Sequence, residues 1–347
     1  MKIGNKKIGE GEPAFIVAEI SSNHRGSLEK AKKIIKAAYL AGADAIKTQT
    51  YTPDDLTINC EKEQFIVKTK GAWSGRSLYS LYQEAHTPYE WQPELKKTAE
   101  SFGLPLFSSV FDEKAVDFWE KLGTSAYKVA SFEIVDIELL KKIAETKKPV
   151  IVSRGMASIE EIELALKTLK ENGASDLAVL HCVSSYPALP EEMNLNTIPD
   201  IKKRFGVISG LSDHTLGTDT AIASVALGAS IIEKHFTLSR AEGGADAGFS
   251  LEPAELKELV RAVRSVEKSI GKVQYGFGAK EAENAVFRRS LYVIKDVKAG
   301  ETFTRENVRC IRPGYGLAPK HLPEILGKKA GKNIERGTAL SFDLVRK

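Results

Sequence analysis

Short apolar segments alternate with longer amphipathic segments along the first 270 residues. Helical periodicity follows each apolar segment, and the final amphipathic segment, residues 252–270, has Pro253 in its first turn and stops before Gly271, as helices commonly do. The amphipathic segments include residues 28–41, 114–122, 137–146 and 159–172. The apolar segments have the length of buried strands and cover residues 14–20, 45–51, 104–111, 125–132, 149–154, 177–184, 207–211 and 230–236.

This alternation predicts an α/β fold, a (β/α)8 TIM barrel. Eight strands that alternate with helices over about 260 residues match the usual size of such a barrel. A doubly wound open sheet is the alternative, but no G-x-G-x-x-G sequence opens any predicted helix. We therefore expect the barrel over residues 1–271, with residues 1–13 forming an N-terminal hairpin.

After Gly271 the pattern changes to short β-type segments. Gly276, Gly278 and a charged run indicate a linker over residues 272–285. Three further segments, at residues 290–294, 308–312 and 339–343, predict a small β domain over residues 286–347. A module of about 60 residues is marginally stable alone, so we expect it to pack on another surface.

Composition narrows the class of partner. The chain has 50 basic and 46 acidic residues and therefore a net charge of +4. This charge balance is too even to indicate binding to nucleic acid or to a membrane surface. Cys60, Cys182 and Cys310 are scattered without a C-x-x-C motif, as in reduced cytoplasmic proteins. The sequence has neither a signal-like N-terminus nor an apolar segment of bilayer length. We therefore predict a cytoplasmic protein that binds anions in a pocket.

Two histidines end neighbouring predicted strands. His214 lies in G-L-S-D-H-T and His235 in I-I-E-K-H-F-T, at the barrel end where active sites are built. Two neutral imidazoles that converge there could hold one divalent metal. Either histidine alone is better explained by hydrogen bonds to the backbone than by a metal. Since the chain has only six histidines, the pair favours a metal site.

Cations and hydroxyls also cluster at the predicted strand ends. Lys47 and Gln49 are two residues apart and therefore share one face of a strand, and Lys128 lies in the fourth strand. Glu19 or Glu133 could pair with such a lysine, but a buried lysine is costly, which favours anion binding. The hydroxyl side chains at the strand ends are Ser108, Ser109, Ser153, Ser184, Ser185, Tyr186 and Ser212. This set suits a phosphate together with a carboxylate, and we count Ser108 among the substrate-binding residues.

Acidic and loop residues complete the predicted site. Glu19 and Glu133 are placed for proton transfer or for ordering water, and Asn23 and His24 follow the first strand as a loop that can touch a polar substrate. The long connection over residues 77–91 either covers a ligand or packs its Leu and Tyr side chains into the barrel wall. Together these residues predict a metal-assisted reaction between a phosphorylated acid and a polyhydroxylated partner.

The same residues carry a family resemblance. V-A-E-x-x-x-N-H, I-K-T-Q-T, Y-K-V-A-S-F-E, S-S-Y-P, G-L-S-D-H-T and E-K-H-F-T-L occur in the order of the sialic acid synthase family, and the chain resembles that family over nearly its whole length. F-R-R-S-L-Y and I-R-P-G, at residues 287–292 and 311–314, resemble its antifreeze-protein-like β-clip domain. K-T-Q-T-Y-T, the 77–91 segment and A-G-F-S-L-E-P resemble its pseudaminic acid synthase branch.

The resemblance implies a reaction and an assembly. Phosphoenolpyruvate would condense with 2,4-diacetamido-2,4,6-trideoxy-L-altrose and water, with C–O cleavage, to give pseudaminic acid and phosphate. A divalent cation, Mn²⁺ or Mg²⁺, would be held by His214 and His235. The family also implies a domain-swapped homodimer in which Arg312 reaches into the partner's barrel to touch the sugar.

By the same resemblance, individual side chains take roles. Glu19 and Glu133 would manage protons and water. Phosphoenolpyruvate would be held by Lys47, Lys128, Ser153 and Ser212, and the sugar by Asn23, Gln49 and Tyr186. Two residues depart from the family pattern: Arg154 stands where threonine is expected, and His181 where relatives often carry lysine.

Three other activities remain open from the sequence. The same chemistry can act on N-acetylmannosamine or on the legionaminic acid precursor, and residues 77–91 would decide between these sugars. A Schiff-base aldolase would use Lys128 or Lys47 as its nucleophile. A non-catalytic sensor of sugar acids is the third possibility.

Overall fold

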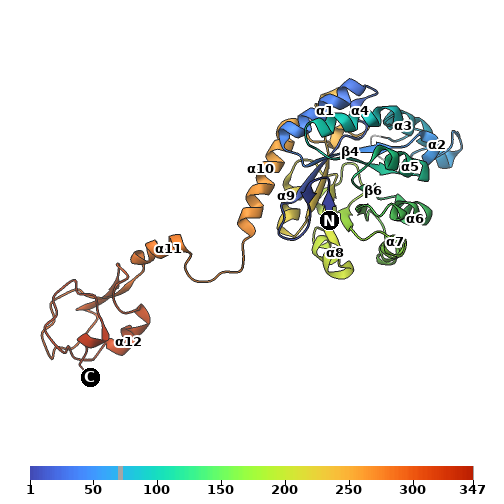
Figure 1. Ribbon diagram of the computed structural model, residues 1–347. Coiled ribbons are helices and arrows are strands. Elements are labelled where there is room, and N and C mark those ends of the chain that lie inside the picture. Colours follow the sequence, from blue (N-terminus) through green and yellow to red (C-terminus); the bar gives the residue numbers. More distant parts are fainter. Residues whose placement is uncertain (69–72, 347) are drawn as a thin grey trace. The chain divides into compact units, whose positions relative to one another are not determined.

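The computed structural model describes residues 1–68 and 73–346 (Figure 1). The chain divides into two compact units, Met1–Gly271 and Lys272–Lys347. The division falls directly after the long helix α10 (Pro253–Ile270). Within the described residues, no helix is both long and apolar enough to cross a membrane.

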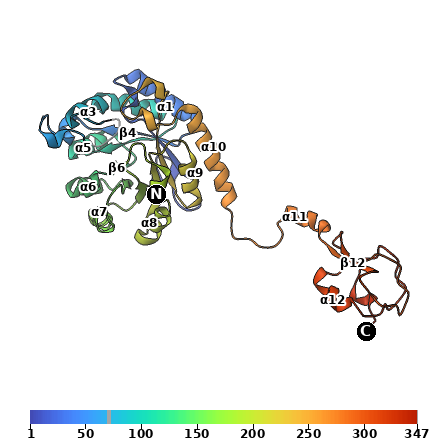
Figure 2. The ribbon, with the colours of Figure 1, turned by 180° about the vertical axis from the view of Figure 1, so that it is seen from behind.

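The first unit is a closed barrel of parallel strands, which confirms the predicted (β/α)8 fold (Figures 1 and 2). The strands follow one another around the barrel in chain order, and the last pairs with the first, with His235 opposite Glu19 in register. They are β3 (Phe15–Glu19), β4 (Ala45–Thr50), β5 (Leu106–Val110), β6 (Tyr127–Val129), β7 (Val150–Ser153), β8 (Leu177–Cys182), β9 (Ile208–Asp213) and β10 (Ile231–His235).

The strands differ from the predicted ranges at their ends, and two of these differences affect the polar end of the barrel. β6 is shorter than the predicted 125–132, because the chain turns after Val129 into a 3-10 helix at Glu133–Val135. β9 runs past the predicted residue 211, so that Ser212 and Asp213 lie in the sheet. Both differences bear on the site, since they decide which polar residues are held rigidly by strands.

Helices surround the barrel, as Figures 1 and 2 show from opposite sides. Several begin with the side-chain caps expected from their sequence: Ser27 accepts from the Lys30 amide, and Ser158 forms a capping box with Glu161. The outer helices are α1 (Leu28–Ala41), α4 (Gln92–Ser101), α5 (Glu113–Leu122), α6 (Ile137–Glu145), α7 (Ile159–Glu171), α8 (Thr197–Phe205), α9 (Asp219–Ala226) and α10. Two short helices, α2 (Pro53–Leu56) and α3 (Leu78–Ala85), lie in the connection between β4 and β5.

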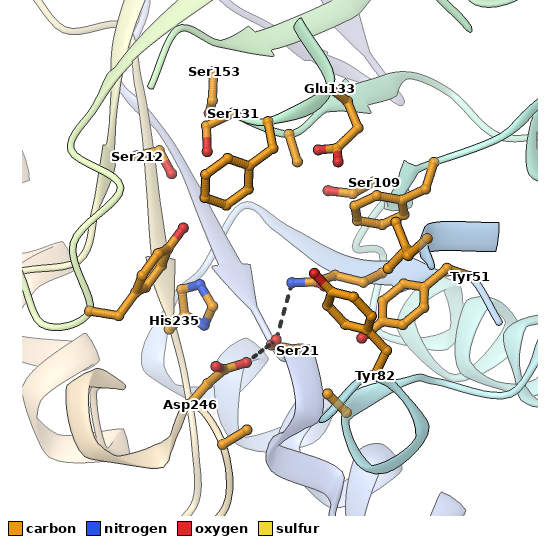
Figure 3. Close-up of a pocket in the computed structure, with 18 of the residues that line it drawn as sticks. Ser21, Tyr51, Tyr82, Ser109, Ser131, Glu133, Ser153, Ser212, His235 and Asp246 are labelled. Carbon is orange, nitrogen blue, oxygen red and sulfur yellow. Dashed lines mark hydrogen bonds between the residues drawn. The ribbon is translucent and has the colours of Figure 1, made fainter. Parts of the chain in front are cut away.

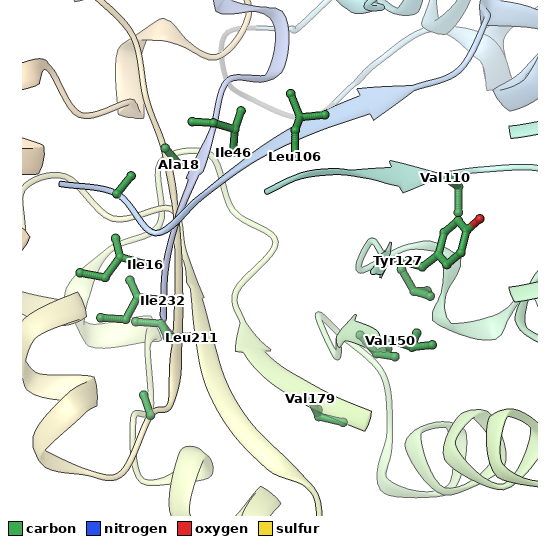
Figure 4. Packing of buried hydrophobic residues seen from close by; sticks show 14 of the residues in the cluster. Ile16, Ala18, Ile46, Leu106, Val110, Tyr127, Val150, Val179, Leu211 and Ile232 are labelled. Atoms are coloured by element: carbon green, nitrogen blue, oxygen red, sulfur yellow. The ribbon is translucent and has the colours of Figure 1, made fainter. Parts of the chain in front are cut away.

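Strand alternation divides the apolar residues into two layers. Outward-facing residues such as Ile16, Ile46 and Leu211 belong to the layer between strands and helices, which Figure 4 shows. Inward-facing residues fill the N-terminal half of the lumen and form its floor: Phe15, Val17, Ala45, Phe107, Ala126, Ile151, Ala178, Leu180 and Ile231. The hairpin of β1 (Lys2–Ile3) and β2 (Lys6–Lys7) adds Ile3 and Ile8 to this cluster and so closes the N-terminal end.

The floor is packed so closely that one strand position requires glycine. A Cβ atom on Gly210 would lie 2.5 Å from the carbonyl oxygen of Ile231 and 2.6 Å from Cδ2 of Leu180. No side chain fits at these distances without displacing β9 from β10. Gly210 therefore lets these strands approach each other directly beneath the polar half of the lumen.

The second unit has its own apolar core. β11 (Ser290–Val293) and β12 (Val308–Ile311) pair antiparallel, and Leu291, Phe303 and Ile325 are completely buried. The predicted third strand is reduced to a single bridge between Tyr292 and Ala339, after which the chain turns at Phe342–Leu344. The short helices α11 (Ala279–Glu283) and α12 (Leu322–Ile325) complete the unit.

Candidate active site

A cavity of about 310 Å³ opens above the lumen floor, at the C-terminal ends of the strands. The same alternation that directs apolar side chains into the floor directs the next inward residues of each strand into the cavity. These strand residues are Lys47, Gln49, Ser109, Lys128, Ser153, Cys182, Ser212, Glu233 and His235, with His214 directly after β9. Figure 3 shows Ser131, Ser212 and Glu133 directed into the same space as His235.

Lys47 occupies the centre of a charged cluster. Its Nζ atom contacts the Glu19 carboxylate, donates a 3.0 Å hydrogen bond to Ser109 Oγ and lies 3.6 Å from Glu233 Oε1. Burial alone would lower the pKa of Lys47, but the carboxylates of Glu19 and Glu233 raise it above its usual value. Lys47 is therefore a cation at neutral pH.

Lys128 is the second buried cation. Its Nζ atom donates to Ser153 Oγ at 2.7 Å and to the carbonyl oxygen of Val129 at 3.1 Å. Burial lowers the pKa of this lysine, with the nearby Glu233 opposing the effect. The two ammonium groups and the serine hydroxyls together form a preorganised site for a multiply charged anion.

Glu233 balances these cations. Its carboxylate accepts a 3.2 Å hydrogen bond from Ser212 Oγ, while its Oε2 atom is buried without a hydrogen-bond partner. Burial would raise the pKa of Glu233, but Lys128 and Lys47 hold it below its usual value, so the residue is a carboxylate. An anionic ligand that binds both lysines must therefore share them with this side chain.

Glu133 and Glu19 differ in their access to the cavity. Burial raises the pKa of Glu133 to about 7, with Lys128 opposing, and its Oε2 atom is buried without a partner. Glu19 lies behind Lys47 and does not line the cavity; its Oε1 atom accepts a 2.6 Å hydrogen bond from the Ser21 amide. Burial also raises the pKa of Glu19. Of the two carboxyl groups, Glu133 is the one that a ligand can touch.

The two predicted histidines meet at one side of the cavity. Their ring centroids are 5.3 Å apart, and the Tyr186 ring lies 4.5 Å from the His214 ring. His214 Nδ1 donates to the carbonyl oxygen of Val183 at 3.0 Å, so the neutral ring presents Nε2 as its acceptor. Burial alone would lower the pKa of His214, but the neighbouring Cys182 raises it above its usual value. Burial lowers the pKa of His235 well below its usual value, so that this imidazole is neutral.

These histidines fit a divalent metal ion. His235 Nδ1 is buried without a hydrogen-bond partner, and neutral imidazoles with one fixed tautomer are the usual metal ligands. In residues 1–68 and 73–346, no group of three or more His, Cys, Asp or Glu side chains forms a metal cage. A cation held by His214 and His235 would therefore take its remaining ligands from water or substrate oxygens, as open catalytic sites do.

A third polar cluster lies beside His235. Ser21, Ser22 and Gln49 surround the buried Asp246: both serine hydroxyls donate to its Oδ2 atom, and Gln49 Nε2 donates to Ser21 Oγ at 3.1 Å (Figure 3). Burial raises the pKa of Asp246, with these hydroxyls opposing. Asp246 and Gln49 both line the cavity, so a polyhydroxylated ligand can bind between them.

Several predicted site residues lie outside this cavity lining, among them Ser184, Ser185 and His24, whose Nε2 atom bonds Thr87 Oγ1 at 3.0 Å. Glu19 stands behind Lys47, as described. Asn23 donates its amide hydrogens to the Phe236 carbonyl oxygen and to Ser250 Oγ, so it holds two loops together. Ser108 faces the helices and bonds Thr50 Oγ1 at 2.7 Å, whereas its neighbour Ser109 lines the cavity. Arg312 belongs to the second unit.

The two departures from the family pattern contact each other instead of the cavity. Arg154 donates through Nε and Nη2 to His181 Nδ1, at 3.1 and 2.8 Å, and through Nη1 to the carbonyl oxygen of Gly155. His181 Nε2 in turn bonds the carbonyl oxygen of Met193. The guanidinium therefore joins the end of β7 to β8, and His181 joins β8 to the loop that follows it. Arg154 is not part of the cavity lining.

The polar lining residues that sequence reasoning missed include Ser21, Ser131, Cys182, Glu233 and Asp246. Glu233 had a usable signal, because it precedes His235 by two residues in one strand and must share its face. Cys182 had the same kind of signal, because it lies two residues beyond Leu180 in β8 and must share its inward face. Ser131 and Asp246 lie in irregular segments, where no periodicity indicates direction.

Comparisons with known proteins agree with this geometry. Residues 34–275 match the NeuB family and residues 288–346 match the SAF domain. The chain is 48% identical to a pseudaminic acid synthase of Campylobacter jejuni over 98% of both chains, and 41% identical to one of Helicobacter pylori over 96% of this chain and 98% of that protein. The crystal structure of an N-acetylneuraminic acid synthetase from Leptospira borgpetersenii, in complex with citrate, is similar with a TM-score of 0.73 at 33% identity, covering 82% of this chain and 94% of that one.

Proposed function

The chain belongs to the NeuB family, and on this premise we propose that it is a pseudaminic acid synthase. The observation that carries the proposal is that two buried lysines and two histidines line one cavity. The chain that contains this cavity is 48% identical to a pseudaminic acid synthase. The reaction would join phosphoenolpyruvate, 2,4-diacetamido-2,4,6-trideoxy-L-altrose and water into pseudaminic acid and phosphate.

Phosphoenolpyruvate would occupy the lysine side of the cavity. Lys47 and Lys128 would neutralise its phosphate and carboxylate, and the hydroxyls of Ser109, Ser153 and Ser212 would donate to the same oxygens. All three serines already touch Lys47, Lys128 or Glu233, so little reorganisation is needed when the anion binds. Binding would thereby fix C3 of the enol in one orientation.

The open-chain sugar would bind over the enol, with its hydroxyl and acetamido groups near Gln49, Asp246 and Tyr186. A divalent cation bound by His214 and His235 would polarise the aldehyde oxygen and so make its carbon more electrophilic. The π electrons of phosphoenolpyruvate would then form the C3–C1 bond, which leaves positive charge at C2. Glu233, a buried carboxylate beside both lysines, would stabilise that charge.

Glu133 would act as the general base. Its free Oε2 atom would take a proton from the water whose oxygen bonds to C2. The resulting tetrahedral carbon would then expel phosphate as its C2–O bond breaks, and the lysines would stabilise the leaving group. Glu19 would keep Lys47 in position and protonated throughout.

Three further parts of the proposal rest on the family resemblance. We propose a domain-swapped homodimer in which Arg312 completes the partner's sugar site. We propose Mn²⁺ or Mg²⁺ as the bound ion, and the cytoplasm, where phosphoenolpyruvate is made, as the location. These remain predictions for the isolated protein.

The test is release of phosphate from phosphoenolpyruvate, with and without Mn²⁺, in the presence of three sugars. These are 2,4-diacetamido-2,4,6-trideoxy-L-altrose, its legionaminic counterpart and N-acetylmannosamine. Metal-dependent release with the first sugar alone would support the proposal. Release with another sugar would retain the chemistry and change the branch, and borohydride trapping of an adduct on Lys128 would indicate an aldolase instead.

A further inference from the structure

One side of the cavity is apolar. We define the apolar wall as Leu56, Val67, Leu78, Leu81, Ala85 and Phe111, together with the rings of Tyr51 and Tyr82. Figure 3 shows Tyr51 and Tyr82 across the cavity from Ser212 and His235. The lysines, serines and histidines come from the strands, whereas most of the wall comes from the connection between β4 and β5.

Helix α3 supplies much of the wall with one face. Leu78, Leu81, Tyr82 and Ala85 occur at positions i, i+3, i+4 and i+7 and therefore share one stripe of the helix. This stripe faces the cavity, while Gln83 is on the exposed side. Within the 77–91 segment, α3 therefore lines the cavity with its apolar stripe and packs against α2.

The wall is held firmly in place. Leu81 is 5% exposed and Tyr51 3% exposed, and the Tyr51 ring makes edge contacts with Tyr82 at 5.9 Å and with Phe111 at 5.1 Å between centroids. The aliphatic side chains of the wall and Phe111 carry no polar group that could face a ligand. The only polar groups that the wall offers are the hydroxyls of Tyr51 and Tyr82.

Resting on the proposed function, we propose that the apolar wall selects the sugar by the methyl groups at its far end. A sugar whose aldehyde lies at the histidines extends carbons 4 to 6 away from them. The 6-deoxy diacetamido sugar carries a methyl at C6 and an acetamido methyl at C4, where N-acetylmannosamine carries hydroxyls. Methyl groups gain by burial against the aliphatic part of this surface, whereas hydroxyls lose hydrogen bonds to water there and find no partner among the leucine, valine and alanine side chains.

The expected ratio of kcat/KM between the two sugars follows from the usual selectivity of apolar pockets. One misplaced methyl or hydroxyl group in an apolar pocket changes kcat/KM by about 10- to 200-fold. We therefore expect the parent protein to prefer 2,4-diacetamido-2,4,6-trideoxy sugars over N-acetylmannosamine by about 100-fold or more. Because the apolar wall favours sugars that carry methyl groups, it selects the class of sugar. Stereoisomers within that class would be distinguished by the polar cluster around Asp246.

The experiment compares kcat/KM for 2,4-diacetamido-2,4,6-trideoxy-L-altrose and for N-acetylmannosamine in three variants. Leu81→Asn and Leu78→Asn place an amide in the wall, and Gln83→Asn is the matched control on the exposed side of α3. We expect each leucine variant to lower the ratio about tenfold or more, with an unchanged KM for phosphoenolpyruvate, and the control to match the parent. A parental ratio in both leucine variants would overturn the inference.

Two further outcomes are also decisive. If Leu81→Asn melts below the assay temperature, the half-buried Leu78 position gives the result alone. If the parent releases phosphate with neither sugar, the proposed function fails, and the wall is judged by calorimetric binding of the two sugars. If the parent binds the deoxy sugar more tightly than N-acetylmannosamine and Leu78→Asn abolishes this difference, the result supports the inference. Equal binding of both sugars to the parent refutes it.

Discussion

Lys234 and Asp213 form a completely buried ion pair directly behind the two histidines. Lys234 Nζ lies 2.8 Å from Asp213 Oδ2, neither side chain is exposed, and the residues are register partners on β10 and β9. Asp213 Oδ1 also accepts from the amide and hydroxyl of Thr215. Since each member directly adjoins a histidine in sequence, the pair fixes the strand ends that bring His214 and His235 together.

Removing one member of this pair should be strongly destabilising. Lys234→Met leaves the Asp213 carboxylate buried without its cation, and we expect the free energy of unfolding to fall by about 3–5 kcal/mol. Urea unfolding measures this loss. The double variant Lys234→Met/Asp213→Asn removes both charges and should recover part of it, and a single variant as stable as the parent would contradict the account.

Metal binding should depend on both histidines. We expect His214→Ala and His235→Ala each to weaken Mn²⁺ binding by more than about 100-fold, because loss of an outer-shell partner alone costs about 10- to 100-fold. The electron paramagnetic resonance signal of free Mn²⁺ measures this directly. His321→Ala, in the second unit, is the control; parental affinity in either site variant would rule out the dihistidine site.

Activity should depend on pH through Glu133. The pKa of Glu133 in the free protein, about 7, means that the carboxylate needed for a general base forms as pH rises through 7, so kcat/KM should increase between about pH 6 and 8. Glu133→Gln should remove this rise and lower kcat by about 10²- to 10⁴-fold. An unchanged acid limb in the Gln variant would assign the titration to another group.

The same pKa predicts a trend in stability. The folded state holds the Glu133 proton more tightly than the unfolded chain, whose carboxyl has the ordinary value of 4.5. The stabilisation is therefore complete below pH 4.5 and is lost as pH rises through about 7. Relative to Glu133→Gln, the parent should lose melting temperature between pH 5 and 8; a constant difference would mean that Glu133 is not perturbed.

Arg154 should have little effect on anion binding. Its guanidinium is directed to His181 and the Gly155 carbonyl, so Arg154→Thr should leave the KM for phosphoenolpyruvate within about twofold while loosening the loop after β8. Initial rates and limited proteolysis of that loop measure the two effects. A tenfold rise in KM would instead place Arg154 on the phosphate.

Regular strands made much of the site predictable. Lys47 and Gln49, Lys128, Ser153 and Ser212 could be placed in one lumen because the period of two determines their direction once the strand is known. The same rule explains Ser108, since an error of one residue reverses the face and Ser109 lines the cavity instead. A prediction from strand patterning therefore depends on correct register.

Irregular segments were less predictable. Asp246 follows β10 in a loop whose direction is set by hydrogen bonds from Ser21 and Ser22, which are more than 200 positions away in sequence. The link between Arg154 and His181 likewise joins two strands by a contact that neither strand's pattern contains. Such tertiary hydrogen bonds leave no periodic signal in the sequence.

The apolar floor beneath the lysines imposes an order of events on the proposed reaction. With the lumen filled by side chains such as Phe107 and Leu180, and its N-terminal end closed by the β1–β2 hairpin, both substrates enter by the C-terminal mouth. Under the proposed function, phosphoenolpyruvate would bind at the lysines within the strands, and the sugar would bind above it. Steady-state kinetics should therefore be ordered, with phosphoenolpyruvate first to bind, and a non-reactive sugar analogue bound second should slow its escape.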